Sequence, residues 1–190
     1  KPFLLDPFHN FIIYNLLGFK LKGTDVVRFH EALIFIPRKN IKTSFAASLA
    51  WALSLWYRRS GSKTYISAAA LMQSLESFNF LDYNIRLMGE DEKHGGGVKI
   101  IDNNNEHSME AELPDGSFFI RALAANPDAQ DSLNCNIAIC DEIHAFTKPK
   151  QYNLFKEAMK AYTNKLLIGI STAGDNEQGF LGQRLQYCRK

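Results

Sequence analysis

The sequence has few of the features that mark secreted, membrane-spanning or strongly basic proteins. It contains only Cys135, Cys140 and Cys188, with no C-x-x-C pair, so neither a disulfide framework nor a zinc knuckle is indicated. Its most apolar stretch, residues 45–57, falls short of the roughly 20 residues that a membrane-spanning helix needs. Lys and Arg number 22 against 20 Asp and Glu, for a net charge of +2. This balance excludes a histone-like protein but leaves room for a DNA-binding surface on one face.

What is present suits one folded domain. The chain of 190 residues is 46% hydrophobic, which is enough to bury a core of ordinary size. The sequence has no repeat, coiled coil or low-complexity tract. We therefore expect a single domain over residues 1–190, in a reducing compartment.

Apolar runs of strand length alternate with helical patterns, which predicts an α/β fold with a mostly parallel central sheet flanked by helices. The predicted strands are residues 32–36, 63–69, 136–140 and 166–170. Three helices are predicted: one that begins near Thr43, one over residues 71–88, and one that includes Tyr152 to Tyr162.

Two further segments complete the expected organisation. Residues 108–113 and 117–123 flank Pro114-Asp115-Gly116, a turn signature that predicts an antiparallel hairpin at the sheet edge. Residues 90–105 are rich in Gly, Asn and charge, which favours a mobile surface loop. The helix after Thr43 is apolar on nearly all sides up to Trp56, so we expect it to be buried.

The first candidate site is the loop between the first strand and the first of these helices. Ligands bind outside the carboxyl ends of strands in open α/β sheets, and Lys42-Thr43 stands there as in a phosphate-binding loop. Lys42 would neutralise phosphate oxygens, while the Thr43 hydroxyl would bind magnesium. The G-x-x-x-x-G-K pattern requires glycine where this chain has Ile36 and Ile41. A branched side chain resists positive φ, so a basic turn with a solvated Lys42 is an equal alternative for this segment alone.

The second site is the pair Asp141-Glu142 at the end of an apolar strand. Adjacent carboxylates at one strand end suit two tasks, since Asp141 can hold the magnesium shell while Glu142 polarises the attacking water. The alternative is a helix cap by Asp141. A strand followed by a Lys-Thr loop precedes this acidic pair in the sequence, and for that reason the catalytic interpretation is stronger than the helix cap.

The third site is Ser171-Thr172, at the end of the strand over residues 166–170. Small hydroxyl side chains in that place can sense a γ-phosphate. Considered alone, they indicate an ordinary turn.

Together, the loop at residues 37–43, the acidic string at residues 140–146 and the Gly-Ile-Ser-Thr-Ala-Gly segment at residues 169–174 resemble the terminase large subunits of tailed phages. The resemblance runs from about Leu5 to the end of the chain. It implies a P-loop NTPase of the additional-strand type, ATP and Mg²⁺ as cofactors, and double-stranded DNA as the substrate moved. It further implies a homo-oligomeric ring, a small terminase subunit and a portal protein as partners, and the cytoplasm of a bacterial host as the location.

The resemblance also assigns roles to residues. Glu142 falls on the catalytic carboxylate, Arg38 on an arginine that contacts the γ-phosphate, and Ser171-Thr172 on the coupling motif. His9 stands where the family has an adenine-reading glutamine. Thr43 and Asp141 fall on the metal positions. The implied nucleotide-binding residues are Pro37, Arg38, Lys39, Asn40, Ile41, Lys42, Thr43, Ser44 and His9.

Other residues near these motifs carry weaker signals. His144 is expected to be a structural hydrogen-bonding residue, since no second histidine at i+4 supports a zinc site. Lys148, Lys150, Lys156 and Lys160 form a solvated helix face, with DNA contact as the lesser alternative.

Two other functions remain open at this point. One is a helicase-like nucleic-acid-dependent ATPase, which shares the D-E-x-H string but normally has a second ATPase-sized domain. The other is a degenerate nucleotide-binding assembly module, disabled by Ile41. The family normally carries a carboxyl-terminal nuclease domain, and nothing after Gly174 resembles one, so we expect this chain not to cut DNA.

Overall fold

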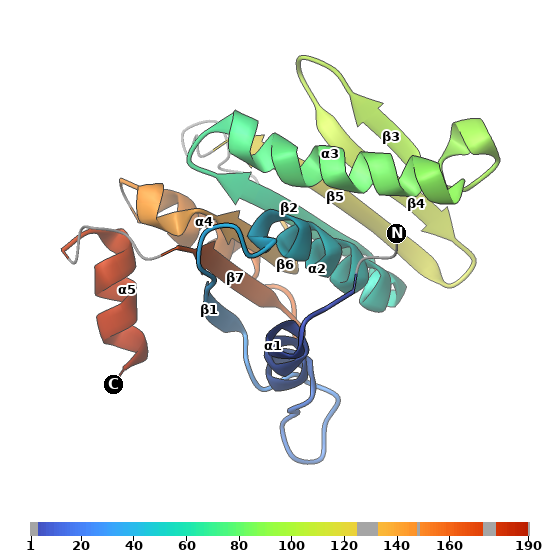
Figure 1. Cartoon of the computed structure of the whole chain (residues 1–190). Coiled ribbons are helices and arrows are strands. Elements are labelled where there is room, and N and C mark those ends of the chain that lie inside the picture. Colours follow the sequence, from blue (N-terminus) through green and yellow to red (C-terminus); the bar gives the residue numbers. More distant parts are fainter. Residues whose placement is uncertain (1–3, 125–132, 148, 173–177, 190) are drawn as a thin grey trace.

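The computed structural model describes residues 4–124, 133–147, 149–172 and 178–189, built around a seven-stranded sheet in the order β1-β7-β6-β2-β5-β4-β3 (Figure 1). The strands are β1 (Glu31–Phe35), β2 (Ser62–Ala68), β3 (Lys99–Asp102), β4 (His107–Leu113), β5 (Gly116–Ala124), β6 (Ile137–Asp141) and β7 (Leu166–Ser171). Pairing is parallel from β1 across to β5 and antiparallel for β5–β4 and β4–β3. The predicted mostly parallel sheet with an antiparallel edge is therefore confirmed.

The position of β7 identifies the type of sheet. β7 lies between β1, which leads into the basic loop, and β6, which ends in the two acids. It is the additional strand that the family resemblance implied. Because all three strands are parallel, their carboxyl ends meet at one edge of the sheet.

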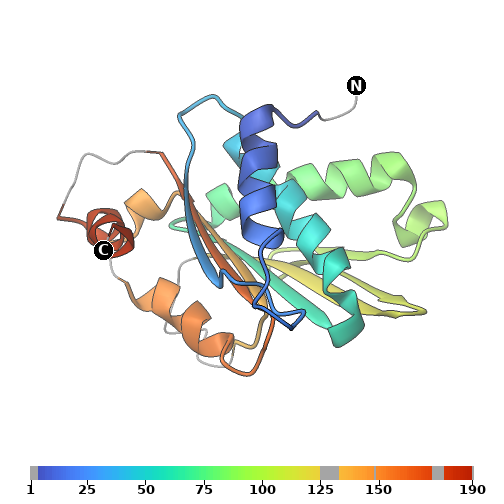
Figure 2. The same ribbon diagram turned by 90° about the horizontal axis from the view of Figure 1, so that it is seen from below.

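Helices cover both faces of the parallel part. They are α1 (Pro7–Leu17), α2 (Lys42–Trp56), α3 (Leu71–Met88), α4 (Lys150–Ala158) and α5 (Phe180–Cys188), with short 3-10 turns η1 (Arg58–Ser60), η2 (Glu92–His94) and η4 (Ile143–Ala145). Figure 2 shows α1, α2 and α3 on one face, and α4 and α5 on the other. Within the described ranges, no helix is long and apolar enough to cross a membrane.

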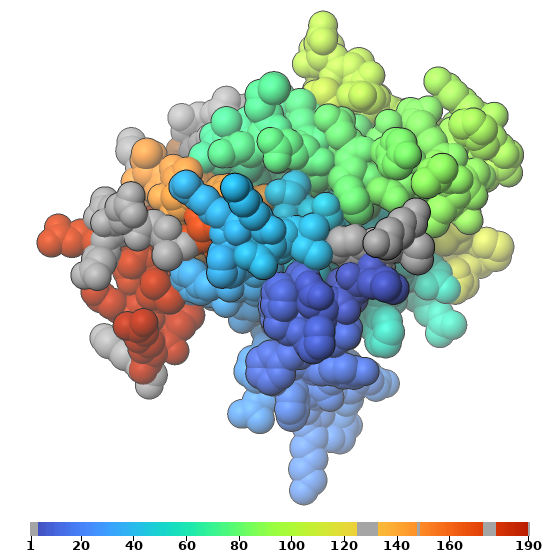
Figure 3. Space-filling view, in the orientation of Figure 1, coloured from blue at the N-terminus to red at the C-terminus, as the bar shows by residue number. Residues whose placement is uncertain are grey.

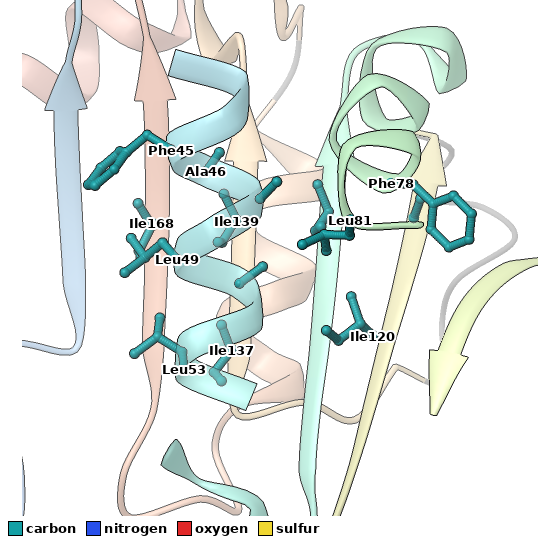
Figure 4. Close-up of a cluster of buried hydrophobic side chains, with 14 of the residues drawn as sticks. Phe45, Ala46, Leu49, Leu53, Phe78, Leu81, Ile120, Ile137, Ile139 and Ile168 are labelled. Atoms are coloured by element: carbon teal, nitrogen blue, oxygen red, sulfur yellow. The ribbon is translucent and has the colours of Figure 1, made fainter. Parts of the chain in front are cut away.

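The main core lies between the sheet and helices α2 and α3 (Figure 4). Phe45 and Leu53 of α2 are almost fully buried, and α2 packs on Ile139 and Ile168 of the neighbouring strands β6 and β7. Burying one such side chain contributes about 1.5–3 kcal/mol. Since α2 begins at the basic loop, this packing fixes the loop relative to β6 and β7.

The second core, on the opposite face, holds α4 and α5 against the sheet. A polar cluster supports it at Glu31, the first residue of β1. The Tyr152 hydroxyl donates to Glu31 Oε1 at 2.9 Å, Lys156 Nζ lies 2.7 Å from Oε2, and Arg184 of α5 also contacts Oε1. Burial alone would raise the pKa of Glu31, but these three partners hold it below the ordinary value.

Three expectations from the sequence need correction. Residues 90–105 are not a simple loop, because they contain η2 and the edge strand β3, where Lys99 Nζ bonds Glu110 of β4 at 2.8 Å. The predicted hairpin is therefore one strand in from the edge. Trp56 is 67% exposed, because α2 buries only the sides that face the sheet, α1 and α3. Helices α1 and α5 lie in segments for which no helix was predicted.

Candidate nucleotide-binding site

The loop between β1 and α2 has an unusual backbone. Lys39 has φ 66° and Ile41 has φ 48°, both in the left-handed region. The Asn40 side chain supports the turn by donating to the carbonyl oxygens of Pro37 and Arg38, at 3.3 and 3.1 Å. Ile41 thus adopts the conformation for which the family pattern has glycine, although such a conformation costs an L-residue about 1–2 kcal/mol.

The loop delivers the amino terminus of α2 to the site. Ile41 is the N-cap residue, and its side chain provides no capping hydrogen bond. The first intrahelical bond runs from the Phe45 amide to the Ile41 carbonyl, so the amides of the preceding residues in the first turn are open donors. Open amides and the positive end of the helix dipole attract anions such as phosphate.

Lys42 points from this helix into the acidic pair of β6. Its Nζ lies 2.9 Å from Asp141 Oδ1 and also contacts Glu142 Oε1. The Lys42 and Asp141 side chains are 9% and 3% exposed. Burial raises the pKa of Asp141 above its ordinary value, although the Lys42 ammonium acts in the opposite direction. The structure therefore brings together two motifs that lie far apart in the sequence, and the solvated-lysine alternative is wrong.

Glu142 ends β6 with a sharp turn. Its φ of 53° is again left-handed, and its amide donates to Asp141 Oδ1 at 2.8 Å. In addition to its contact with Lys42, the Glu142 carboxylate faces the His144 ring, and its Oε2 atom lies 2.9 Å from Nδ1 of that ring. Glu142, not Asp141, is the N-cap residue of the following turn η4, and no side-chain hydrogen bond caps that turn, so the helix-cap alternative for Asp141 does not hold. The residue pattern gave no signal for the left-handed backbone at Glu142.

The third motif lies beside the acidic pair. Ser171 is fully buried, and its Oγ accepts the His144 amide at 3.2 Å and lies 3.0 Å from His144 Nδ1. The Thr172 Oγ1 atom is buried and has no hydrogen-bond partner among the described residues. Ala173 and Gly174, which complete the motif, lie outside the described residues.

Gly169 explains how the third motif approaches the second. A Cβ at Gly169 would lie 2.8 Å from a side-chain carbon of Ile143 and 2.9 Å from one of Leu33. The missing side chain therefore makes room for Ile143, so η4 packs directly on β7. That packing keeps His144 within hydrogen-bonding distance of Ser171.

A pocket of about 250 Å³ lies where these groups meet. Figure 3 shows the segment that holds the loop and the start of α2, in light blue, at the molecular surface. The residues that line the pocket are Pro37, Arg38, Lys39, Ile41, Lys42, Thr43, Ser44, Glu142 and Thr172. A larger hollow of about 470 Å³ over β2, β4 and β5 lacks the helix terminus and the acidic pair, so its volume alone does not make it the better candidate.

Two predicted contributors are placed differently. His9 is fully buried in α1, with its ring centre 4.6 Å from that of Phe45 and its Nδ1 accepting the Asp6 amide at 3.2 Å. Burial lowers the pKa of His9, against a weaker opposing effect of Asp6. His9 does not line the pocket, and its interpretation as a base-reading residue stays a prediction. Asn40 supports the loop from outside the lining.

Two of the four lysines differ in exposure: Lys160, just after α4, is 70% exposed, whereas Lys156 of α4 is 35% exposed. Lys156 pairs with Glu31, and Lys160 pairs with Glu157. Lys148 lies outside the described residues. These pairs occupy two of the charges that were considered for DNA contact.

Comparison with known proteins agrees with the geometry. The family description "Terminase large subunit, ATPase domain" matches residues 7–190. The large terminase of bacteriophage HK97 aligns over 100% of this chain and 37% of its own, with 22% identity and a TM-score of 0.77. The Thermus phage P74-26 large terminase ATPase domain aligns over 87% of this chain and 70% of its own, with 16% identity and a TM-score of 0.56.

A further match is the large terminase of the thermophilic bacteriophage D6E in complex with ATP-gamma-S, with 8% identity, a TM-score of 0.55, and coverage of 74% of this chain and 32% of that one. Among curated proteins none matches the sequence. The chain thus spans 37% of the length of the HK97 protein. With a family match over nearly its whole length and a sheet of the same architecture, the chain belongs to the ATPase domain family of terminase large subunits.

Proposed function

We propose that this chain hydrolyses ATP to drive double-stranded viral DNA into a procapsid. The observation that carries the proposal is the convergence of Lys42, Glu142 and Thr172 on one pocket at the amino terminus of α2. Phosphoryl transfer to water requires a cation, a carboxylate and hydrogen-bond donors that are free to bind phosphate oxygens. Here the donors are the Thr172 hydroxyl and the backbone amides of the first turn of α2.

The geometry supports the following assignment of binding groups. The first-turn amides of α2 and the Lys42 ammonium would hold the phosphates, while the exposed Arg38 at the pocket offers its planar fork to the γ-phosphate. The Thr43 hydroxyl and the Asp141 carboxylate are hard oxygen donors, which fits Mg²⁺. When bound, Mg²⁺ supplies positive charge that neutralises the phosphate oxygens.

Glu142 would orient the attacking water and accept its proton. Its carboxylate is bound by Lys42 and faces His144. Phosphate oxygens compete with carboxylates for an ammonium, so a bound triphosphate draws Lys42 away from the acidic pair. Glu142 is then available to the water, and Thr172 Oγ1 can bond either the water or the γ-phosphate.

Relatives support the choice of nucleotide and of process. The D6E large terminase has been solved with ADP and with ATP-gamma-S, and the family acts in genome packaging. From this we infer DNA as the moved substrate, a homo-oligomeric ring as the working form, a small terminase subunit and a portal protein as partners, and the host cytoplasm as the location.

Substitution of the catalytic carboxylate tests the proposal. Glu142→Gln should lower the ATP turnover rate by about two to four orders of magnitude, the range for loss of a general base, while nucleotide affinity stays within a few-fold. Glu112→Gln, an exposed glutamate on β4, is the matched control and should turn over like the parent. Equal hydrolysis by all three proteins would remove Glu142 from the mechanism, and a parent that binds ATP without turnover would favour an assembly module.

A further inference from the structure

The His144 ring connects two of the three motifs. One ring atom, Nδ1, lies 2.9 Å from Glu142 Oε2 and 3.0 Å from Ser171 Oγ. The same residue donates its backbone amide to Ser171 Oγ. The imidazole therefore stands between the carboxylate that would orient water and the hydroxyl of the third motif.

One nitrogen cannot serve both partners fully. A ring nitrogen that carries hydrogen donates, and one without hydrogen accepts. In the arrangement seen here Nδ1 bonds Ser171, and Glu142 Oε2, although 2.9 Å away, has no hydrogen-bond partner among the described residues. With hydrogen on Nδ1 and the ring turned toward Glu142, His144 would donate to that carboxylate oxygen. Without it, Nδ1 accepts the Ser171 hydroxyl and turns a lone pair toward Glu142, which removes the attraction. The two arrangements exclude each other, so this side chain is a two-state element.

We propose that His144 is a positioning residue that passes the hydrogen-bonding state of Ser171 to Glu142. The inference rests on the proposed function of Glu142. Ser171 is followed directly by Thr172, which lines the pocket and whose buried hydroxyl has no hydrogen-bond partner in the described part of the chain. An occupant of the pocket would therefore act on the strand end that carries Ser171. When Ser171 donates to the ring, His144 releases Glu142; when Ser171 turns away, His144 holds the carboxylate.

A purely structural His144 would tie η4 to β7 and do nothing more. That tie does not depend on the ring, since the backbone amide of residue 144 bonds Ser171 Oγ whatever the side chain. Ile143, packed over Gly169, holds η4 independently. Substitutions of the His144 side chain should therefore leave the fold intact, and they can show whether the ring positions Glu142.

The test compares two amides of different reach. In His144→Asn the side-chain amide stands near the place of Nδ1, whereas in His144→Gln it extends to the place of Nε2. We expect His144→Gln to lower kcat about ten- to a hundredfold, the factor for one hydrogen bond to a charged group, with KM for ATP changed less than about threefold. His144→Asn should keep kcat within about threefold of the parent. Equal loss in both variants, or a change confined to KM, would overturn the proposal.

A second readout does not require turnover. Nitrogen NMR of ¹⁵N-histidine-labelled protein distinguishes a protonated from an unprotonated Nδ1. In the parent, a non-hydrolysable ATP analogue should move the Nδ1 signal of His144, and in Ser171→Ala the signal should stay where it is with or without the analogue. An unmoved signal in the parent refutes the switch while leaving hydrolysis by Glu142 intact. A moved signal in a parent without ATP turnover supports the switch and refutes the proposed function.

Discussion

Ile41 offers the sharpest test of the phosphate-loop geometry. It sits at φ 48° and ψ 28°, where a β-branched L-residue is strained by about 1–2 kcal/mol and glycine is not. The strain belongs to the folded protein, so relieving it should raise the free energy of unfolding. Ile41 is 42% exposed, so few packing contacts oppose that gain.

The perturbation is a pair of substitutions, Ile41→Ala and Ile41→Gly. Both remove the branched side chain, and they differ only in the Cβ. At ordinary backbone angles glycine is less stable than alanine by about 0.5–1 kcal/mol, because it loses more freedom on folding. At a left-handed position the order reverses, and we expect the glycine variant to be more stable than the alanine variant by about 1 kcal/mol. For a domain of this size that difference corresponds to roughly 2–4 °C in Tm.

Thermal and denaturant unfolding of the three proteins measure this order directly. Titration with a non-hydrolysable ATP analogue adds a second measurement, since removing the Cβ from the pocket wall should tighten binding about fivefold, which corresponds to ~1 kcal/mol. A glycine variant less stable than the alanine variant would show that residue 41 does not hold a left-handed conformation in solution. Our explanation of the glycine-free loop would then be wrong.

The remaining predictions concern charges and thiols. Lys42→Met leaves two carboxylates without their shared cation, so calorimetry should find no ATP binding, and denaturant unfolding should show a loss of roughly 1–3 kcal/mol, below the range for fully buried pairs. The folded-state pKa of Glu31 is lowered, so its stabilisation is present above its unfolded pKa and is lost as pH falls through its folded pKa. Glu31→Gln should therefore be less stable than the parent at pH 7, the difference should shrink as pH falls through the folded pKa of Glu31, and a difference that does not change with pH would contradict this. Burial raises the pKa of Cys135 to about 12 and that of Cys140 further, so a thiol reagent should label Cys188 alone in the native protein and all three cysteines after denaturation.

The fold was largely predictable because its signals are local. Strands β1, β6 and β7 are largely continuous apolar runs, and helical composition located α3 at residues 71–88. The segment at residues 90–105 was misjudged, because β3 forms through pairing with β4, and a short edge strand has little pattern of its own. Trp56 was misjudged because apolar composition alone does not tell which side of a helix has a neighbour.

The site divides in the same way. By itself the sequence predicted which residues would carry the chemistry, since Lys42, Glu142 and Ser171 each directly follow or end a strand or loop of recognisable pattern. Only the tertiary structure decided how they meet: Lys42 between two carboxylates, and His144 between Glu142 and Ser171. Those contacts join strands that are adjacent in the sheet but distant in the chain, and they depend on left-handed backbone at positions without glycine. Local sequence patterns report the type and the periodicity of side chains. The contacts of Lys42 and His144 and the left-handed backbone angles arise from packing of the whole sheet, so no local pattern could predict them.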